Sequence, residues 1–310
     1  MTRRVPELSL TDFTRGTIRA REAFSTDLMR GLQDYGFVIL RDHEVRAELL
    51  ERAYGLAERV FALPEAEKHR YAKGLRGYTP FGTEHAKDSK SPDLKEFWQI
   101  GREPVEGAGP PEDFPPNVWP EGVEGFRETF LSLFEALDET GRALLRALAP
   151  GLALPEDWFE PRVRFGTSIL RVLHYPPVSD DAPPGAVRSA AHEDINFITI
   201  LVAARGAGLQ LLDRDGTWLP VETEPGGLIV DSGDMLQRLT NGVIPATTHR
   251  VVNPEGPNVS RYTMPFFMHP ASDVSLKCLP SCVGDGEKWP EITAGAFLDQ
   301  RLREIGLKTA

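Results

Sequence analysis

The chain of 310 residues has few cysteines, no long apolar segment and fewer basic than acidic residues. Its two cysteines, Cys278 and Cys282, have the wrong spacing for a Cys-x-x-Cys redox pair, and no further thiol is available to complete a zinc site. We therefore expect reduced thiols and a cytoplasmic protein. No apolar run is long enough to span a bilayer, and the N-terminus lacks the apolar stretch of a signal peptide.

The charge balance is acidic, with 46 acidic and 35 basic residues and a formal net charge of −11. This balance argues against nucleic acid or an anionic membrane as a partner, since both attract basic surfaces. An acidic average still allows a local basic pocket for a small anion. The length and the 41% of hydrophobic residues are typical of a globular protein with a sizeable core.

Hydrophobic periodicity divides the chain into a helical first part and a second part rich in short strands. Helical spacing predicts helices over 24–35 and 46–63, a third over roughly 122–152 and a closing helix over 293–309. A short strand is expected at 37–40, and a Pro/Gly-rich loop at 101–120. Six strand-like segments follow, and we expect no helix among them: 167–175, 196–202, 209–221, 226–242, 247–252 and 260–270.

This pattern predicts a mixed α and β fold, with a double-stranded β-helix (jelly-roll) core and a helical N-terminal region wrapped around it. Residues 1–120 would form the capping region and residues 121–310 the core, together one structural unit. The segments "RDG" at 214–216 and "SGD" at 232–234 are interpreted as hairpin turns.

The segment "AHEDINFITILV", Ala191 to Val202, places a histidine and a carboxylate at the start of an apolar run. If the segment is one strand, His192, Asp194 and Asn196 share a face, because side chains alternate along a strand. A bound dication would remove the cost of burying Asp194. The His-x-Asp pattern alone is a weak signal, since a surface histidine beside an acid is common.

His249, in "PATTHRVV", is the candidate for a third ligand. It lies in the predicted strand region 57 positions after His192, and the turn signal "LTNG" before it would fold its strand back. Two imidazoles and one carboxylate leave open positions on a metal, as in the facial triad of non-haem Fe(II) sites. By itself, His249 is more simply a buried structural histidine, so the triad needs further support.

That support comes from Arg261 and Thr263 in "RYTMPFF", which share one face of a predicted strand. A guanidinium among aromatic residues needs an anion, and its geometry suits a carboxylate. Tyr175, at the end of another strand in "LRVLHYPP", places a phenol for a third hydrogen bond. A metal triad with such a group predicts a site for a small chelating diacid, although Arg261 in a surface ion pair is the alternative.

The pattern of His192-x-Asp194, His249 and Arg261-x-Thr263 resembles the Fe(II)/2-oxoglutarate-dependent dioxygenases of the isopenicillin N synthase-like group. The likeness extends along nearly the whole chain, through "DYGFVILRDHEV", "YPP", "GLQLL", "GDMLQRLTNG" and "HRVVNP". Two departures occur. The family usually has Arg-x-Ser where this chain has Thr263, and several relatives have asparagine where it has Leu173.

The resemblance implies an oxidoreductase that uses Fe(II), 2-oxoglutarate and O2. It would oxidise a small organic molecule by hydroxylation, desaturation or cyclisation, with release of succinate and CO2, as a monomer or weak homo-oligomer. The implied Fe(II) ligands are His192, Asp194 and His249. The implied contacts of the far carboxylate of 2-oxoglutarate are Arg261, Thr263 and Tyr175. Candidate substrate contacts are Val251, Phe267 and Tyr78, and Asn196 is a candidate for orienting a ligand.

Three other functions remain open from the sequence. An oxidase of the isopenicillin N synthase type, which uses Fe(II) and O2 without 2-oxoglutarate, also keeps the Arg/hydroxyl pair. A zinc-dependent hydrolase suits the His/Asp/His set, but it leaves Arg261 and Thr263 without a role. A non-catalytic binding protein on the same scaffold would be expected to have lost a metal ligand.

Overall fold

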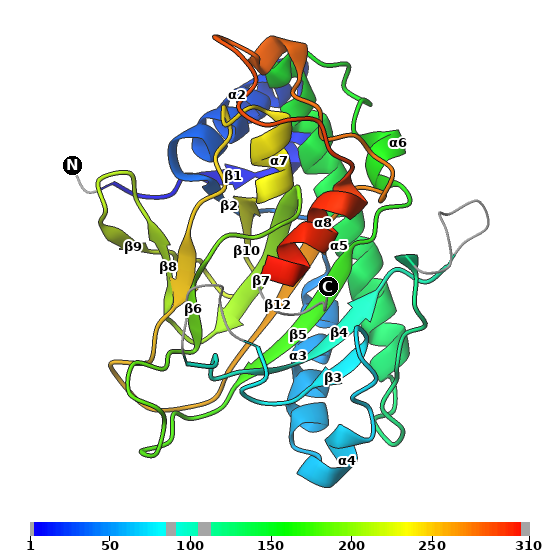
Figure 1. The fold of residues 1–310 in the computed structure, drawn as a ribbon, viewed down its shortest axis with the longest axis vertical. Coiled ribbons are helices and arrows are strands. Elements are labelled where there is room, and N and C mark those ends of the chain that lie inside the picture. Colours follow the sequence, from blue (N-terminus) through cyan, green and yellow to red (C-terminus); the bar gives the residue numbers. More distant parts are fainter. Residues whose placement is uncertain (1–2, 85–90, 105–112, 305–310) are drawn as a thin grey trace.

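The computed structural model describes residues 3–84, 91–104 and 113–304 (Figure 1). In this part of the chain, two β-sheets form the centre of the molecule. The strands of the large sheet lie in the order β1 (Glu7–Ser9), β2 (Phe37–Arg41), β10 (Leu228–Ser232), β7 (Ile198–Arg205), β12 (Arg261–Met268), β5 (Ile169–Tyr175), β4 (Glu96–Gly101) and β3 (Gly77–Thr79). The small sheet has the order β6 (Ser189–His192), β11 (His249–Val251), β8 (Leu209–Leu212) and β9 (Trp218–Pro220).

Among these strands the pairing is antiparallel, except for the parallel pair of β1 and β2. The small sheet lies at one side of the large sheet (Figure 1). Four strands of the large sheet, β1 to β4, come from the first 120 residues of the chain. The mixed fold with a jelly-roll core is therefore confirmed, and the N-terminal region contributes strands as well as helices.

The two faces of the large sheet differ, because side chains alternate along its strands. The outer face, with Val172 of β5 and Phe266 of β12, packs against the helices in one large apolar core. The inner face, with Leu173 of β5 and Leu201 of β7, joins a second apolar core that includes Leu211 of the small sheet. The space between the two sheets is thus the interior of the jelly roll.

The three predicted N-terminal and central helices are confirmed as α2 (Ile18–Tyr35), α3 (Ala47–Phe61) and α5 (Phe126–Leu148). Helix α2 begins after Thr17, whose side chain accepts a hydrogen bond from the backbone of Ala20, and ends at Gly36 with φ of +67°. A 3-10 turn, η2 (Ala149–Leu152), follows α5. Shorter helices are α1 (Leu10–Thr14), α4 (Glu65–His69) and α6 (Glu160–Val163).

The expectation of a strand over the whole of 226–242, without helices among the strands, is wrong. Strand β10 ends at Ser232, and "SGD" is not a hairpin turn but leads into helix α7 (Asp234–Leu239). Met235, Leu236 and Leu239 are buried, with the spacing of one helix face. The other predicted turn, "RDG" at 214–216, connects the hairpin of β8 and β9 as expected.

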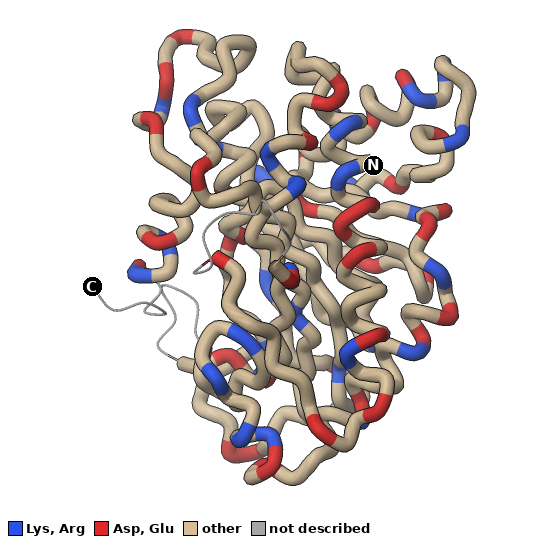
Figure 2. The backbone as a smooth tube through the Cα atoms, turned by 90° about the vertical axis from the view of Figure 1, so that its right-hand side faces the viewer, with Lys and Arg blue, Asp and Glu red and all other residues tan. Residues whose placement is uncertain are grey.

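The closing helix is confirmed as α8 (Ala294–Glu304). The last residues of its predicted range, and residues 105–112 of the predicted loop, lie outside the described part of the chain. Both cysteines are free and buried. None of the described helices has the length and apolar character needed to cross a membrane. Basic and acidic residues are interspersed along the visible backbone (Figure 2).

Candidate functional site

Three of the predicted site residues meet where the small sheet approaches β7. His192 ends β6 and pairs with His249 of β11, and the centroids of their rings lie 4.4 Å apart. Oδ1 of Asp194 lies 3.7 Å from Nε2 of His192 and 3.8 Å from Nε2 of His249. One possible ligand atom from each residue lies within 4.8 Å of the others. A metal ion with bonds of about 2.1 Å fits among these atoms after a small contraction.

The local backbone differs from the single strand expected over Ala191–Val202. Strand β6 ends at His192 and β7 begins only at Ile198, so His192 and Asp194 converge through a bend and not through strand alternation. The bend is held from the start of α7, where the N–H of Asp234 donates to the carbonyl of Asp194 at 2.7 Å. Gly233 leaves the necessary space, because a Cβ there would lie 2.4 Å from the carbonyl oxygen of Asn196.

Both imidazoles present Nε2 to the carboxylate. Nδ1 of His192 lies 2.7 Å from the carbonyl oxygen of Ala190, and Nδ1 of His249 lies 3.1 Å from that of Thr247. A carbonyl oxygen only accepts hydrogen bonds, so each Nδ1 carries the proton and each Nε2 keeps its lone pair. Burial and the neighbouring His249 lower the pKa of His192 to about 4, which favours the neutral ligand form.

Asp194 is held by a short chain of polar side chains. Its Oδ2 accepts a hydrogen bond from Oγ1 of Thr199 on β7, and that hydroxyl in turn accepts one from Nδ2 of Asn196 at 2.9 Å. Asn196 therefore acts on the carboxylate through Thr199. Burial opposes ionisation of Asp194, but His249 and His192 hold its pKa below the usual range. Oδ1 remains directed to the two imidazoles.

Asp231 is a neighbour of Asp194 that the sequence reasoning missed. It is buried in β10 directly across from Thr199 of β7. Burial and the charge of Asp194 raise the pKa of Asp231 well above its usual value. The available signal was an acid inside the apolar strand "LIVDS".

The second group of predicted residues lies where β12 begins. Arg261 is 1% exposed and pairs in register with Tyr175, whose ring centroid lies 5.1 Å from the guanidinium carbon. Its Nε donates to the carbonyl of Gly206 at 3.2 Å, and its Nη1 has no partner among the described residues. Oγ1 of Thr263 donates to the carbonyl of Val202 at 3.2 Å. A buried guanidinium nitrogen without an acceptor fits an anion.

Of the three candidate substrate contacts, two lie inside the jelly roll and one does not. Val251 belongs to the inner apolar core, and Phe267 lies opposite Thr199 of β7. Tyr78 is on the outer face of the sheet, where its hydroxyl donates to Glu96 at 2.5 Å and its ring packs near Trp98. The expected contact of Tyr78 with the site is therefore wrong, because the pleat of β3 directs this side chain to the helices.

A cluster of charged residues on the inner face was also missed. The guanidinium of Arg171 lies 4.5 Å from the ring centroid of Phe97 and 5.4 Å from that of Phe267, and its Nη1 is 3.2 Å from Glu84. Lys95 pairs with Glu84 at 2.9 Å and with Asp93 at 2.8 Å. Strand alternation could have placed Arg171 on the inner face, since it lies four residues before Tyr175 and therefore on the same face of the strand.

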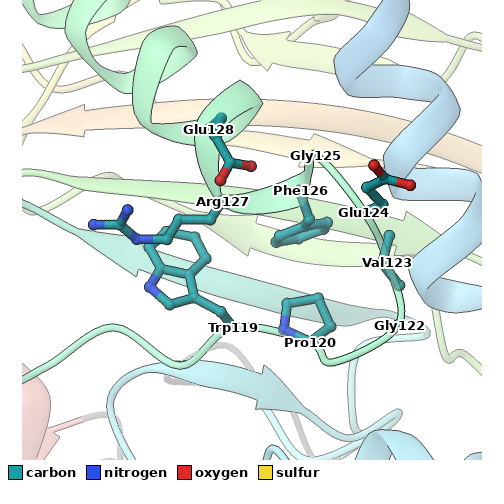
Figure 3. Close-up of a pocket in the computed structure, with 9 residues that line it drawn as sticks. All are labelled: Trp119, Pro120, Gly122, Val123, Glu124, Gly125, Phe126, Arg127 and Glu128. Carbon is teal, nitrogen blue, oxygen red and sulfur yellow. The ribbon is translucent and has the colours of Figure 1, made fainter.

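A surface hollow of about 530 Å³ lies elsewhere, at the start of α5 (Figure 3). It is lined by residues of the segment 119–128, among them Trp119, Phe126 and Arg127. None of the predicted site residues lines it, so this hollow is separate from the interior of the jelly roll.

Comparison with known proteins agrees with this geometry. The family model described as "non-haem dioxygenase in morphine synthesis N-terminal" matches residues 5–122, and the model of the 2OG-Fe(II) oxygenase superfamily matches residues 166–270. The 2-oxoglutarate-Fe(II) type oxidoreductase hxnY of Emericella nidulans is 35% identical over 296 residues, which cover 90% of this chain and 84% of that protein. The 2-oxoglutarate-dependent dioxygenase htyE of Aspergillus rugulosus is 30% identical over 305 residues, covering 92% and 93%.

Solved structures give the same result. A 2OG-Fe(II) oxygenase family protein from Caulobacter crescentus has a TM-score of 0.88 and 41% identity, covering 98% of this chain and all of that one. A full-length Neurospora crassa protein in complex with alpha-KG and thymine has a TM-score of 0.86 and 27% identity, covering 96% of both chains. These matches favour a 2-oxoglutarate-dependent enzyme over the oxidase, hydrolase and binding-protein alternatives. The chain belongs to the 2OG-Fe(II) oxygenase superfamily, as an isopenicillin N synthase-like oxidoreductase that uses Fe(II), 2-oxoglutarate and O2.

Proposed function

We propose that this protein oxidises a small organic molecule by hydroxylation, desaturation or cyclisation, while 2-oxoglutarate is converted to succinate and CO2. One observation carries the proposal: strand β12 begins at Arg261, a buried arginine without an acidic partner among the described residues, and runs to Phe267, which lies opposite Thr199, the hydrogen-bond donor to Asp194 of the triad. An anion site and a metal site thus lie along one inner face, as a chelating dicarboxylate requires.

The proposed Fe(II) ligands are His192, Asp194 and His249. Two neutral imidazoles and one carboxylate fit Fe(II) with open positions for exchangeable ligands. When bound, Fe(II) supplies the chemistry that couples O2 and 2-oxoglutarate to oxidation of the substrate. The protein's own contribution is to hold each Nε2 free by a backbone hydrogen bond on Nδ1, and to keep Oδ1 of Asp194 in place through Thr199.

The proposed contacts of the far carboxylate of 2-oxoglutarate are Arg261, Thr263 and Tyr175. Nη1 of Arg261 has a free N–H to donate, and the phenol of Tyr175 lies beside it. The hydroxyl of Thr263 donates to Val202, so it would rotate to donate to the carboxylate. These contacts fix one end of the cosubstrate while its other end meets the metal.

The substrate is proposed to lie against Phe267, with Val251 near the cosubstrate and Arg171 and Phe97 on the neighbouring strands. Rings of Phe97 and Phe267 around the Arg171 guanidinium suit a small, flat molecule with a hydrogen-bond acceptor. The Neurospora crassa structure with thymine supports a small ring compound as the class.

We further infer that the protein acts in the cytoplasm as a monomer or weak homo-oligomer, without a nucleic-acid or membrane partner. The net charge of −11 supports the absence of a nucleic-acid or anionic-membrane partner, since both attract basic surfaces. We also propose that residues 1–120 and 121–310 work as one unit, with the first part capping the second. In support, β2 pairs with β10 and β4 pairs with β5 across this division.

Succinate formation under air tests the proposal. The Fe(II)-loaded protein should convert 2-oxoglutarate slowly to succinate without substrate, and a screen of small molecules should find compounds that raise this rate. The variant His249→Ala should form none. Absence of succinate with every compound, together with hydrolytic activity of the Zn(II)-loaded protein, would contradict the proposal.

A further inference from the structure

We propose that Arg188 is a second guanidinium of the cosubstrate site, which holds the far carboxylate of 2-oxoglutarate together with Arg261. The inference rests on the proposed function, because it concerns the same ligand. It adds a cosubstrate-binding residue that lies outside the Arg-x-Thr motif and outside the triad.

Arg188 is anchored so that its side chain turns inward. It lies directly before β6 and is 2% exposed. Its backbone N–H donates to Oδ1 of Asn253 at 3.1 Å, and its Nη2 donates to the carbonyl of Val259 at 2.5 Å. Val259 precedes Arg261 by two residues, so the guanidinium of Arg188 reaches the beginning of β12. Its Nε is buried and has no partner among the described residues.

Arg188 and Arg261 lie in one electrostatic environment. Burial lowers the pKa of Arg188, and the positive charge of Arg261 lowers it further, while Tyr175 acts in the opposite direction. Burial lowers the pKa of Arg261 too, and Tyr175 again opposes the effect. Tyr175 therefore lies close to both guanidinium groups.

No acid neutralises this pair in the part of the chain that the structure describes, where none of the ion pairs includes Arg188 or Arg261. Two buried cations without a counter-ion are strongly unfavourable. A carboxylate between them would relieve both costs. Its two oxygens accept about four hydrogen bonds, and the unpartnered donors at hand are Nε of Arg188 and Nη1 of Arg261.

Two guanidinium groups predict a stronger preference for 2-oxo acids with a second carboxylate than Arg261 alone would give. 2-Oxo acids with a second carboxylate should bind more tightly than 2-oxo acids that end in a methyl group. A purely structural Arg188, which only links β6 to the start of β12 through Val259, would affect both classes of ligand equally.

The test compares 2-oxoglutarate with 2-oxopentanoate, which has a methyl group in place of the far carboxylate. Dissociation constants are measured by calorimetry on the Fe(II)-loaded protein without O2, for wild type, Arg188→Gln, Arg188→Lys and Arg261→Gln. Arg250→Gln is the matched control, since Arg250 lies on β11 beside His249 but stacks on Trp218 at 3.8 Å.

We expect Arg188→Gln to weaken the binding of 2-oxoglutarate about tenfold and the binding of 2-oxopentanoate less than about threefold. Arg188→Lys, which keeps the positive charge, should weaken the binding of 2-oxoglutarate less than Arg188→Gln does. The control Arg250→Gln should keep the wild-type ratio of the dissociation constants of 2-oxopentanoate and 2-oxoglutarate. If Arg188→Gln and Arg188→Lys both keep that ratio, or weaken both ligands equally, the role of Arg188 is contradicted. If wild type itself does not prefer 2-oxoglutarate, the proposed cosubstrate site fails as a whole.

Discussion

Gly36 lies directly against Thr247, so that a Cβ atom on Gly36 would be 2.0 Å from Oγ1 of Thr247. Gly36 ends helix α2 in the left-handed conformation, and Thr247 holds Nδ1 of His249 through its carbonyl oxygen. The end of an N-terminal helix thus supports a candidate metal ligand more than 200 residues later in the chain.

The variant Gly36→Ala should therefore lower both stability and metal affinity. The positive φ alone costs about 1 kcal/mol, and displacement of Thr247 should weaken Fe(II) binding about tenfold. Gly216→Ala is the matched control, because Gly216 has φ of +85° with no atom within 4 Å of its Cβ position. Thermal unfolding and Fe(II) titration would give both quantities. Equal metal affinity of the two variants would refute the link from Gly36 to the site.

Thr199→Val should weaken metal binding without disturbing the fold. The exchange nearly keeps the shape of the side chain but removes both the donor to Oδ2 of Asp194 and the acceptor of Asn196, so Fe(II) affinity should fall about 10- to 100-fold. Thr248→Val, which removes a hydrogen bond to Glu193 close to the triad, should leave the affinity unchanged. Anaerobic Fe(II) titration measures this, and wild-type affinity in Thr199→Val would show that Asp194 is held by other contacts.

Lys95→Met should destabilise the protein by about 3–5 kcal/mol, because among the described residues it leaves buried Asp93 without a cation and Glu84 with Arg171 alone. Burial opposes the charged form, but Glu84 and Asp93 raise the pKa of Lys95. Asp93 also accepts a hydrogen bond from the backbone of Ala190 at 2.9 Å, which ties this cluster to β6. Urea unfolding checks the loss. The double variant Glu84→Gln, Lys95→Met should recover part of it, and a loss below about 1 kcal/mol would show that water reaches the cluster.

His269 should make stability depend on pH between about 4 and 6.5. Burial lowers the pKa of His269 to about 4, whereas the unfolded chain titrates near 6.5. Between these values the unfolded state binds one more proton, so stability rises with pH, by up to about 3 kcal/mol. His269→Gln should reduce this slope in the metal-free protein, where buried His192 also contributes to it, and His69→Gln, at an exposed position, should not. An unchanged slope in His269→Gln would mean that this imidazole titrates normally.

The family likeness indicated the candidate triad, whereas the single strand expected over Ala191–Val202 was wrong, because β6 ends at His192 and β7 begins at Ile198. Strand alternation was sufficient for Arg261 and Thr263, which both lie on β12. It missed α7, since six residues in "DMLQRL" are too few to distinguish a helix from a continuing strand. The side of the sheet that Tyr78 occupies did not follow from the sequence, because only its pairing with Trp98 of β4 decides it. Arg188 was missed because its contacts, Asn253 and Val259, lie 65 and 71 residues away.

The most direct test of the account is an anaerobic titration of 2-oxoglutarate into the Fe(II)-loaded protein, observed by visible absorption. Chelation of the metal by the 2-oxo acid should produce a weak charge-transfer band in wild type. His249→Ala should lose the band together with Fe(II) binding, and Arg261→Gln should require far more 2-oxoglutarate to reach it. A protein that binds Fe(II) tightly but shows no band at any concentration, or a band unaffected by His249→Ala, would contradict the site proposed for this chain.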